Sequence, residues 1–215
     1  MADHNLKEID AMFSIRKFIR DLRKYKKAML LSILIFAAGL VLGAANADTL
    51  TRLVMPNLEQ LSRISRDLAQ SEHPEWNFFL FIFFNNVTKS LGVMLLGAIL
   101  GILPAFFLLM NGLALGFVVA AAGGRGENLV DLIVRGLLPH GIIEIPAILI
   151  AAGFGMQFGY LAVKSLGEAG SRDASERTVD WRGFLVSAGR GAIWIVVMLL
   201  VAAVIESTLT FYLVG

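Results

Sequence analysis

Long apolar runs recur along this 215-residue chain and constrain its fold more than any other feature. A helix of about 20 apolar residues crosses the roughly 30 Å hydrocarbon core of a bilayer. Apolar residues make up 57% of the sequence and the mean hydropathy is +0.72, well above an ordinary soluble domain. We therefore predict an all-α fold, a polytopic membrane helix bundle that has the lipid bilayer as its solvent.

The apolar runs predict about five transmembrane helices. The run from Phe78 to Ala122 is too long for one helix, and Leu103-Pro104 is the natural turn within it. Residues 28–215 are expected to form a single transmembrane bundle. Its predicted spans are about 28–45, 78–102, 105–122, 129–163 and 184–213.

The fourth of these spans contains residues that disturb a helix. Proline removes a backbone donor and glycine loosens the backbone, so Pro139 and Gly141 predict a break at 139–141. Pro146 lies one further turn along the same run. The expected result is a broken or re-entrant element around 132–146.

Residues 1–27 form a basic lead-in to the first span. Seven bases and one acid, Asp21, lie between Phe13 and Lys27. Apolar residues recur among them at helical spacing: Met12, Ile15, Phe18, Ile19, Leu22 and Tyr25. We predict an amphipathic helix on the cytoplasmic membrane surface, with its bases against anionic lipid headgroups. A nucleic-acid partner is not expected, because a basic run beside a span usually signals topology.

The distribution of Lys and Arg predicts the orientation. The lead-in and residues 164–183 carry most of the Lys and Arg and belong in the cytoplasm, so the N-terminus is expected to be cytoplasmic and the C-terminus extracytoplasmic. Arg190 is expected to extend from the last span to the headgroups. Residues 46–77 then lie outside, with an amphipathic helix at about 56–70 that is either a cap over the bundle or a docking surface. The first apolar run starts near Ala28, so no cleavable signal peptide is expected.

Two ionisable residues, His140 and Glu144, lie four positions apart in the fourth span. Such residues inside a membrane mark a functional site by default. One hypothesis is a proton or cation relay with Glu206, because histidine titrates near neutral pH. The other is structural: Glu144 caps backbone donors that the break beside Pro139 frees. Both hypotheses stay open at this point.

Three more polar residues interrupt predicted spans. Asn86 and Asn111 suit hydrogen bonds between helices. Lys89 is placed near mid-membrane, where a lone ammonium group is costly. We therefore predict that Lys89 pairs with Glu144 or with Glu206.

Pairs of glycines spaced four residues apart predict close helix packing, because small residues let two backbones approach. The same faces favour self-association, and a homodimer is the expected state. These glycines are Gly39, Gly43, Gly97, Gly101, Gly112, Gly116, Gly155 and Gly159.

Enzymatic signatures are missing from the sequence. The chain has no cysteine and three histidines, and it contains no nucleophile elbow, phosphate loop or zinc signature. We expect no catalytic residues, no cofactor and no metal. Catalysis would have to take place inside the membrane with His140 and Glu144 alone.

Three motifs together resemble one family, the stage II sporulation protein M family of bacterial and archaeal integral membrane proteins. They are Phe84-Asn85-Asn86, Asn111-Gly112 followed by Gly116, and Leu138-Pro139-His140-Gly141 followed by Glu144. The resemblance implies a non-enzymatic membrane protein that scaffolds or localises partners, which in the sporulation member degrade peptidoglycan. The alternative expectation is a transporter or channel that uses His140 and Glu144 at a broken helix.

Overall fold

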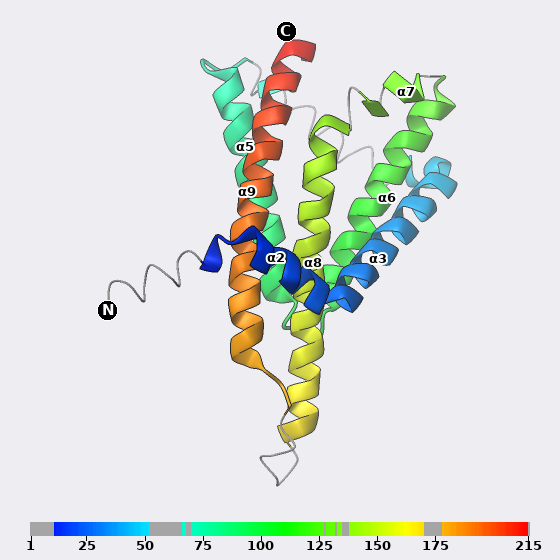
Figure 1. Ribbon diagram of the computed structural model, residues 1–215. Helices are drawn as coiled ribbons and strands as arrows, with labels where there is room; N and C mark the ends of the chain where they lie inside the picture. The colour runs from blue at the N-terminus through cyan, green and yellow to red at the C-terminus, as the bar shows by residue number, and fades with distance from the viewer. Residues whose placement is uncertain are drawn as a thin grey trace.

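Five long helices make up the body of the protein in a computed structural model, which describes residues 11–51, 66–67, 70–126, 128–131, 133–134, 138–169 and 178–214. All five are long and apolar enough to cross a membrane (Figure 1). They are α3 (Lys26–Ala45), α5 (Pro74–Leu96), α6 (Ile102–Gly124), α8 (Leu138–Ala169) and α9 (Trp181–Val214). The described residues contain no strand, so the predicted all-α bundle of five spans is confirmed.

Two shorter helices accompany the spans. α2 (Ile15–Lys24) begins where the Ser14 hydroxyl accepts a hydrogen bond from the Lys17 amide at 3.4 Å. α7 (Leu129–Asp131) is a single turn ahead of α8. The helix predicted at about 56–70 falls mainly on residues outside the described ranges, and so do residues 1–10 of the lead-in.

Four of the predicted glycines form one seam between α3 and α6. A Cβ added at Gly39 or Gly43 would overlap a backbone carbonyl of α6, and one added at Gly112 or Gly116 would overlap a carbonyl of α3. The two backbones are therefore in direct contact, which suits a bilayer, where packing rather than water exclusion joins helices. This contact is called here the α3–α6 seam. Its four glycines pack within one chain, although the prediction of a homodimer rested on such glycines packing between two chains.

The other four glycines meet where α5 turns into α6. A Cβ at Gly97 would overlap the backbone of Gly155, and one at Gly159 would overlap the backbone of Gly101. The turn covers residues 97–101 and ends at Gly101, whose φ of +70° favours glycine. The predicted turn at Leu103-Pro104 was therefore wrong by a few residues. Proline fits the first turn of α6 because an amide there has no helical partner to lose.

The predicted break in the fourth span is only partly found. The chain is divided ahead of Leu138, since α7 and α8 are separate helices. The break at 139–141 is wrong, because α8 runs without interruption through Pro139, Gly141 and Pro146. Pro139 is the second residue of α8, where a missing amide costs no hydrogen bond.

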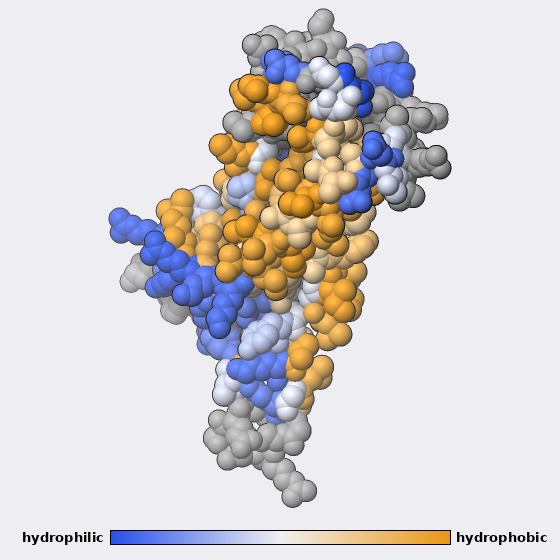
Figure 2. Space-filling model, turned by 90° about the vertical axis from the view of Figure 1, so that its right-hand side faces the viewer, coloured by the Kyte–Doolittle hydropathy of each residue, from blue (hydrophilic) through white to orange (hydrophobic). Residues whose placement is uncertain are grey.

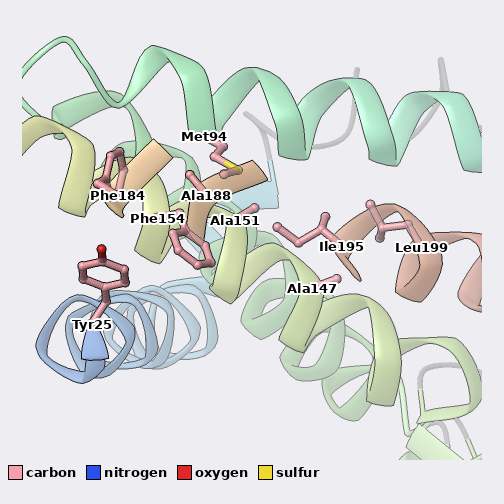
Figure 3. Packing of buried hydrophobic residues seen from close by; sticks show 9 residues of the cluster. All are labelled: Tyr25, Met94, Ala147, Ala151, Phe154, Phe184, Ala188, Ile195 and Leu199. Carbon is pink, nitrogen blue, oxygen red and sulfur yellow. The ribbon is translucent and has the colours of Figure 1, made fainter. Parts of the chain in front are cut away.

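The core is formed where α5, α8 and α9 meet the junction of α2 with α3. Tyr25, at that junction, lies edge-on to Phe154 and Phe184, with ring centroids 5.9 and 5.8 Å apart. Figure 3 shows small residues of α8 and α9, Ala147, Ala151 and Ala188, between the larger ones. Large and small side chains thus interlock across three spans.

The bases of α2 mark one edge of the bilayer. Arg20, Arg23 and Lys24 are exposed on this helix, and charged groups are unstable in hydrocarbon. α2 crosses α9 near Arg190 and Trp194, about halfway along the bundle (Figure 1). In Figure 2 the hydrophilic band lies below an orange, apolar midsection. We therefore expect one edge of the hydrocarbon at this level, and the end of the bundle beyond it is called here the α2 side.

Two helices are too long to end at that edge. α8 has 32 residues and α9 has 34, or about 48 and 51 Å. The hydrocarbon core needs about 30 Å, which is the length of the 20-residue α3. Figure 1 shows α8 and α9 continuing below α2 past the other spans. Residues 158–169 of α8 and 181–188 of α9 form this lower part of the two helices, called here the stem.

Candidate functional site

An apolar cavity lies between α3, α6 and the first half of α8. Its volume is about 660 Å³, and it contains two of the predicted polar residues, Asn111 and Glu144. The rest of its lining is almost wholly hydrocarbon, which makes the amide and the carboxylate the distinctive chemical groups. The described lining residues are Phe36, Leu40, Ala44, Asn111, Leu115, Gly116, Val119, Ile133, Gly141, Ile142, Glu144, Ile145, Pro146 and Ile148.

Asn111 is held by its own helix. Its side-chain amide donates to the Phe107 carbonyl at 2.8 Å, one turn back along α6. Asn86 likewise accepts at 3.4 Å from its neighbour Asn85. Among the described residues, the hydrogen bonds of these two side chains therefore stay within α6 and α5, and the predicted bonds between helices are not found.

Glu144 is half-buried in the second turn of α8 and lines the cavity. The six positions from Leu138 to Glu144 place it about 9 Å from the helix start. His140 lies one turn nearer that start, so it sits close to the outer end of the span rather than at mid-membrane. The structure describes the backbone of His140 and not its side chain, and its pairing with Glu144 stays a prediction.

Lys89 does not form the ion pair predicted for it. Its side chain is exposed on α5, and among the described residues it pairs with neither Glu144 nor Glu206. The reason is the direction of its helix face, because the neighbouring Ser90 and Val93 point into the bundle and are buried. Lys89 thus faces the bilayer side of α5, about 10 Å from the end of that helix at Leu96.

Glu206 is separate from the cavity. It is half-buried on α9, sixteen positions beyond Arg190 or about 24 Å along the helix. It is not among the residues that line the cavity around Glu144. The described geometry therefore brings Asn111 and Glu144 together and leaves Asn86, Lys89 and Glu206 elsewhere.

The buried ion pair of Arg190 with Asp21 was not predicted from the sequence. Arg190 was expected to extend to the headgroups, but it is buried and forms an ion pair with Asp21 of α2. Its Nε also donates to the Ala11 carbonyl at 2.9 Å. Asp21 is the single acid of the basic lead-in, and that isolation is the signal that could have identified it.

α2 is consequently held against the bundle by protein contacts, where the sequence predicted contact with the membrane surface. Phe18 is buried and stacks on Trp194 of α9, with centroids 5.8 Å apart. Phe13, Ile15 and Ile19 are exposed and remain for the lipid. The apolar residues of the lead-in therefore include one that packs against α9 and three that stay exposed, and the contact of those three with lipid stays a prediction.

Comparison with known proteins identifies the family. Two uncharacterized proteins of Methanocaldococcus jannaschii, MJ0706 and MJ0793, are each 28% identical to this chain. The first alignment covers 96% of this chain and 90% of the relative, and the second covers 86% and 94%. No solved structure matches the chain. The family model for stage II sporulation protein M matches residues 32–211, from within α3 almost to the end of α9, and the chain belongs to that family.

Proposed function

We propose that this protein is a non-enzymatic membrane scaffold that binds a partner protein on the α2 side of the bilayer. The observation that carries the proposal is the stem. On the α8 half of the stem, the side chains of Tyr160, Val163 and Leu166 are 60%, 49% and 72% exposed. They lie beyond the hydrocarbon edge, where exposed apolar side chains favour a protein contact.

The stem is stiff enough to present such a surface. Phe158 packs against Trp181 and Phe184 at centroid distances of 5.7 and 5.6 Å. The Trp181 indole donates to the Ser165 hydroxyl at 2.8 Å, which ties the two helices together near the tip. Little conformational freedom is lost when a partner binds to a surface held in this way.

The orientation of the scaffold is part of the same proposal. The bases of the lead-in place the α2 side, and with it the stem, in the cytoplasm by the positive-inside rule. With five spans the C-terminus then lies outside. A partner that acts on the cell wall would reach the stem through a cytoplasmic or membrane segment of its own.

Co-purification tests the scaffold. The tagged wild type, Val163→Ser/Leu166→Ser and the neighbouring control Lys164→Gln are recovered from the native membrane in mild detergent and compared by quantitative mass spectrometry. We expect a stoichiometric protein with the wild type and with the control, and at least a tenfold loss with the double variant. Equal recovery in all three samples would remove the stem as the docking surface.

The cavity supports a second candidate, a transporter or channel. A carboxylate and an amide in an apolar cavity inside a bundle are the kind of group that binds a solute or an ion during transport. In proteoliposomes, Glu144→Gln is expected to abolish flux and to leave assembly intact. Flux that is unchanged in Glu144→Gln would exclude this use of the cavity.

A further inference from the structure

A second cavity, of about 560 Å³, lies between α2 and the first turns of α9. Four bases and two acids line it, which leaves a net charge of +2. It lies at the level of α2 and just beyond, where lipid headgroups meet water. The described lining residues are Arg20, Asp21, Lys24, Asp180, Arg182, Gly183, Val186, Ser187 and Arg190.

Both acids of this cavity are already engaged. Asp21 forms the buried ion pair with Arg190. Asp180 accepts from the Gly183 amide at 2.8 Å and lies 3.9 Å from the Lys24 ammonium. Neither carboxylate is thus available to neutralise another base on the cavity wall.

Arg20 and Arg182 are the two bases of this cavity that have no acidic partner among the described residues. Both are exposed, and neither forms a hydrogen bond or an ion pair with any residue in the part of the chain that the structure describes. They come from different helices, α2 and α9, and border one cavity. The buried ion pair of Asp21 with Arg190 holds those two helices against each other, and with them the backbone positions of Arg20 and Arg182.

We propose that this cavity binds a phosphoryl group, with Arg20 and Arg182 as its two principal ligands. A guanidinium group presents paired donors that match phosphate oxygens, and two arginines that pair with no described acid line this one cavity. Lys24 adds a third positive charge, partly offset by Asp180. The phosphoryl group belongs either to an anionic lipid in the adjoining leaflet or to a soluble phosphate compound. Binding of a lipid phosphoryl group requires that α2 lies at the level of the lipid headgroups. It does not require the proposed scaffold function.

A matched pair of double variants tests the site. Arg20→Gln/Arg182→Gln removes two charges from the cavity. Arg16→Gln/Arg23→Gln removes two exposed charges from the same basic face but outside the cavity. General attraction to an anionic surface treats both pairs alike, at about 1 kcal/mol for each base. A defined site distinguishes them.

The readout is native mass spectrometry of purified protein in mild detergent with added phosphatidylglycerol or phosphatidylcholine. Titration with inorganic phosphate, followed by calorimetry, is the second arm. We expect one phosphatidylglycerol per chain in the wild type and in the control pair, and at least a tenfold loss in the cavity pair. Phosphate binding without lipid retention, lost in the cavity pair alone, would identify a soluble phosphate compound as the source and support the same site.

Three results would overturn the proposal. They are equal losses in both double variants, equal retention of phosphatidylcholine and phosphatidylglycerol, and no binding of lipid or phosphate to the wild type. Arg20→Lys/Arg182→Lys guards against a folding defect, since it keeps the charge and loses only the paired donors. It is expected to bind several-fold more weakly than the wild type and to unfold at the same temperature.

Discussion

The α3–α6 seam is a parallel helix pair and the stem an antiparallel one, and the two pairs are held together in opposite ways. The seam joins two backbones through glycines, with no large side chain between them. The stem joins its helices through large aromatic rings, Phe158, Trp181 and Phe184. We attribute the difference to the solvent around each pair. In lipid, burying apolar rings gains little free energy, so close backbone packing stabilises a helix pair, whereas in water the burial of the rings itself stabilises it.

The largest effect is expected in the stem. Phe184 is 2% exposed, and Phe184→Ala should lower the free energy of unfolding by about 4 kcal/mol, since water-driven burial is lost and a void remains. Its neighbour Leu185 is exposed, and Leu185→Ala should have almost no effect. Thermal unfolding of both variants in detergent measures the difference. Equal unfolding temperatures of the two variants would mean that the burial of Phe184 does not stabilise the stem.

Breaking the contact between α2 and α9 comes next. Asp21→Leu leaves Arg190 buried without its partner, at a cost of about 3 kcal/mol. Adding Arg190→Met removes the stranded charge and should restore most of the stability. Chemical unfolding of the two single variants and the double variant forms the cycle. Additive losses would show that the two side chains do not act as a pair.

The α3–α6 seam should tolerate even one methyl group poorly. Gly116→Ala pushes a Cβ into the Leu40 carbonyl and is expected to cost about 2 kcal/mol. Gly92→Ala is the control, because a Cβ there meets nothing within 4 Å. That change should be neutral or slightly stabilising, as alanine favours helix. A fall in unfolding temperature that is equal for both variants would show that backbone contact does not hold the seam.

The smallest effect is expected near the tip of the stem. Ser165→Ala removes the acceptor of the Trp181 indole and should cost about 1 kcal/mol. Hydrogen exchange of the amides near Ser165 should rise, while exchange within α3 and α6 stays the same. Faster exchange throughout the protein would contradict the separation of stem and seam.

The predicted site was only partly right, and its failures share a cause. The sequence placed Lys89, Glu144 and Glu206 in neighbouring spans and inferred contacts from that. Which way each residue faces depends on the rotation of its helix, and that rotation is set by partners such as the buried Ser90 and Val93. Glu144 and Asn111 line the same cavity because α6 and the first half of α8 border it together with α3.

Hydrophobic periodicity and length by themselves determined the five spans, because each must cross the same thickness of hydrocarbon. The glycine spacing also indicated where backbones approach. Tertiary structure alone decided that α8 runs through Pro139 without a break, that Arg190 turns inward to Asp21, and that α8 and α9 extend past the other spans on the α2 side. These outcomes depend on partners far away in the chain, and no local pattern carries the energy of a contact between residues 169 positions apart.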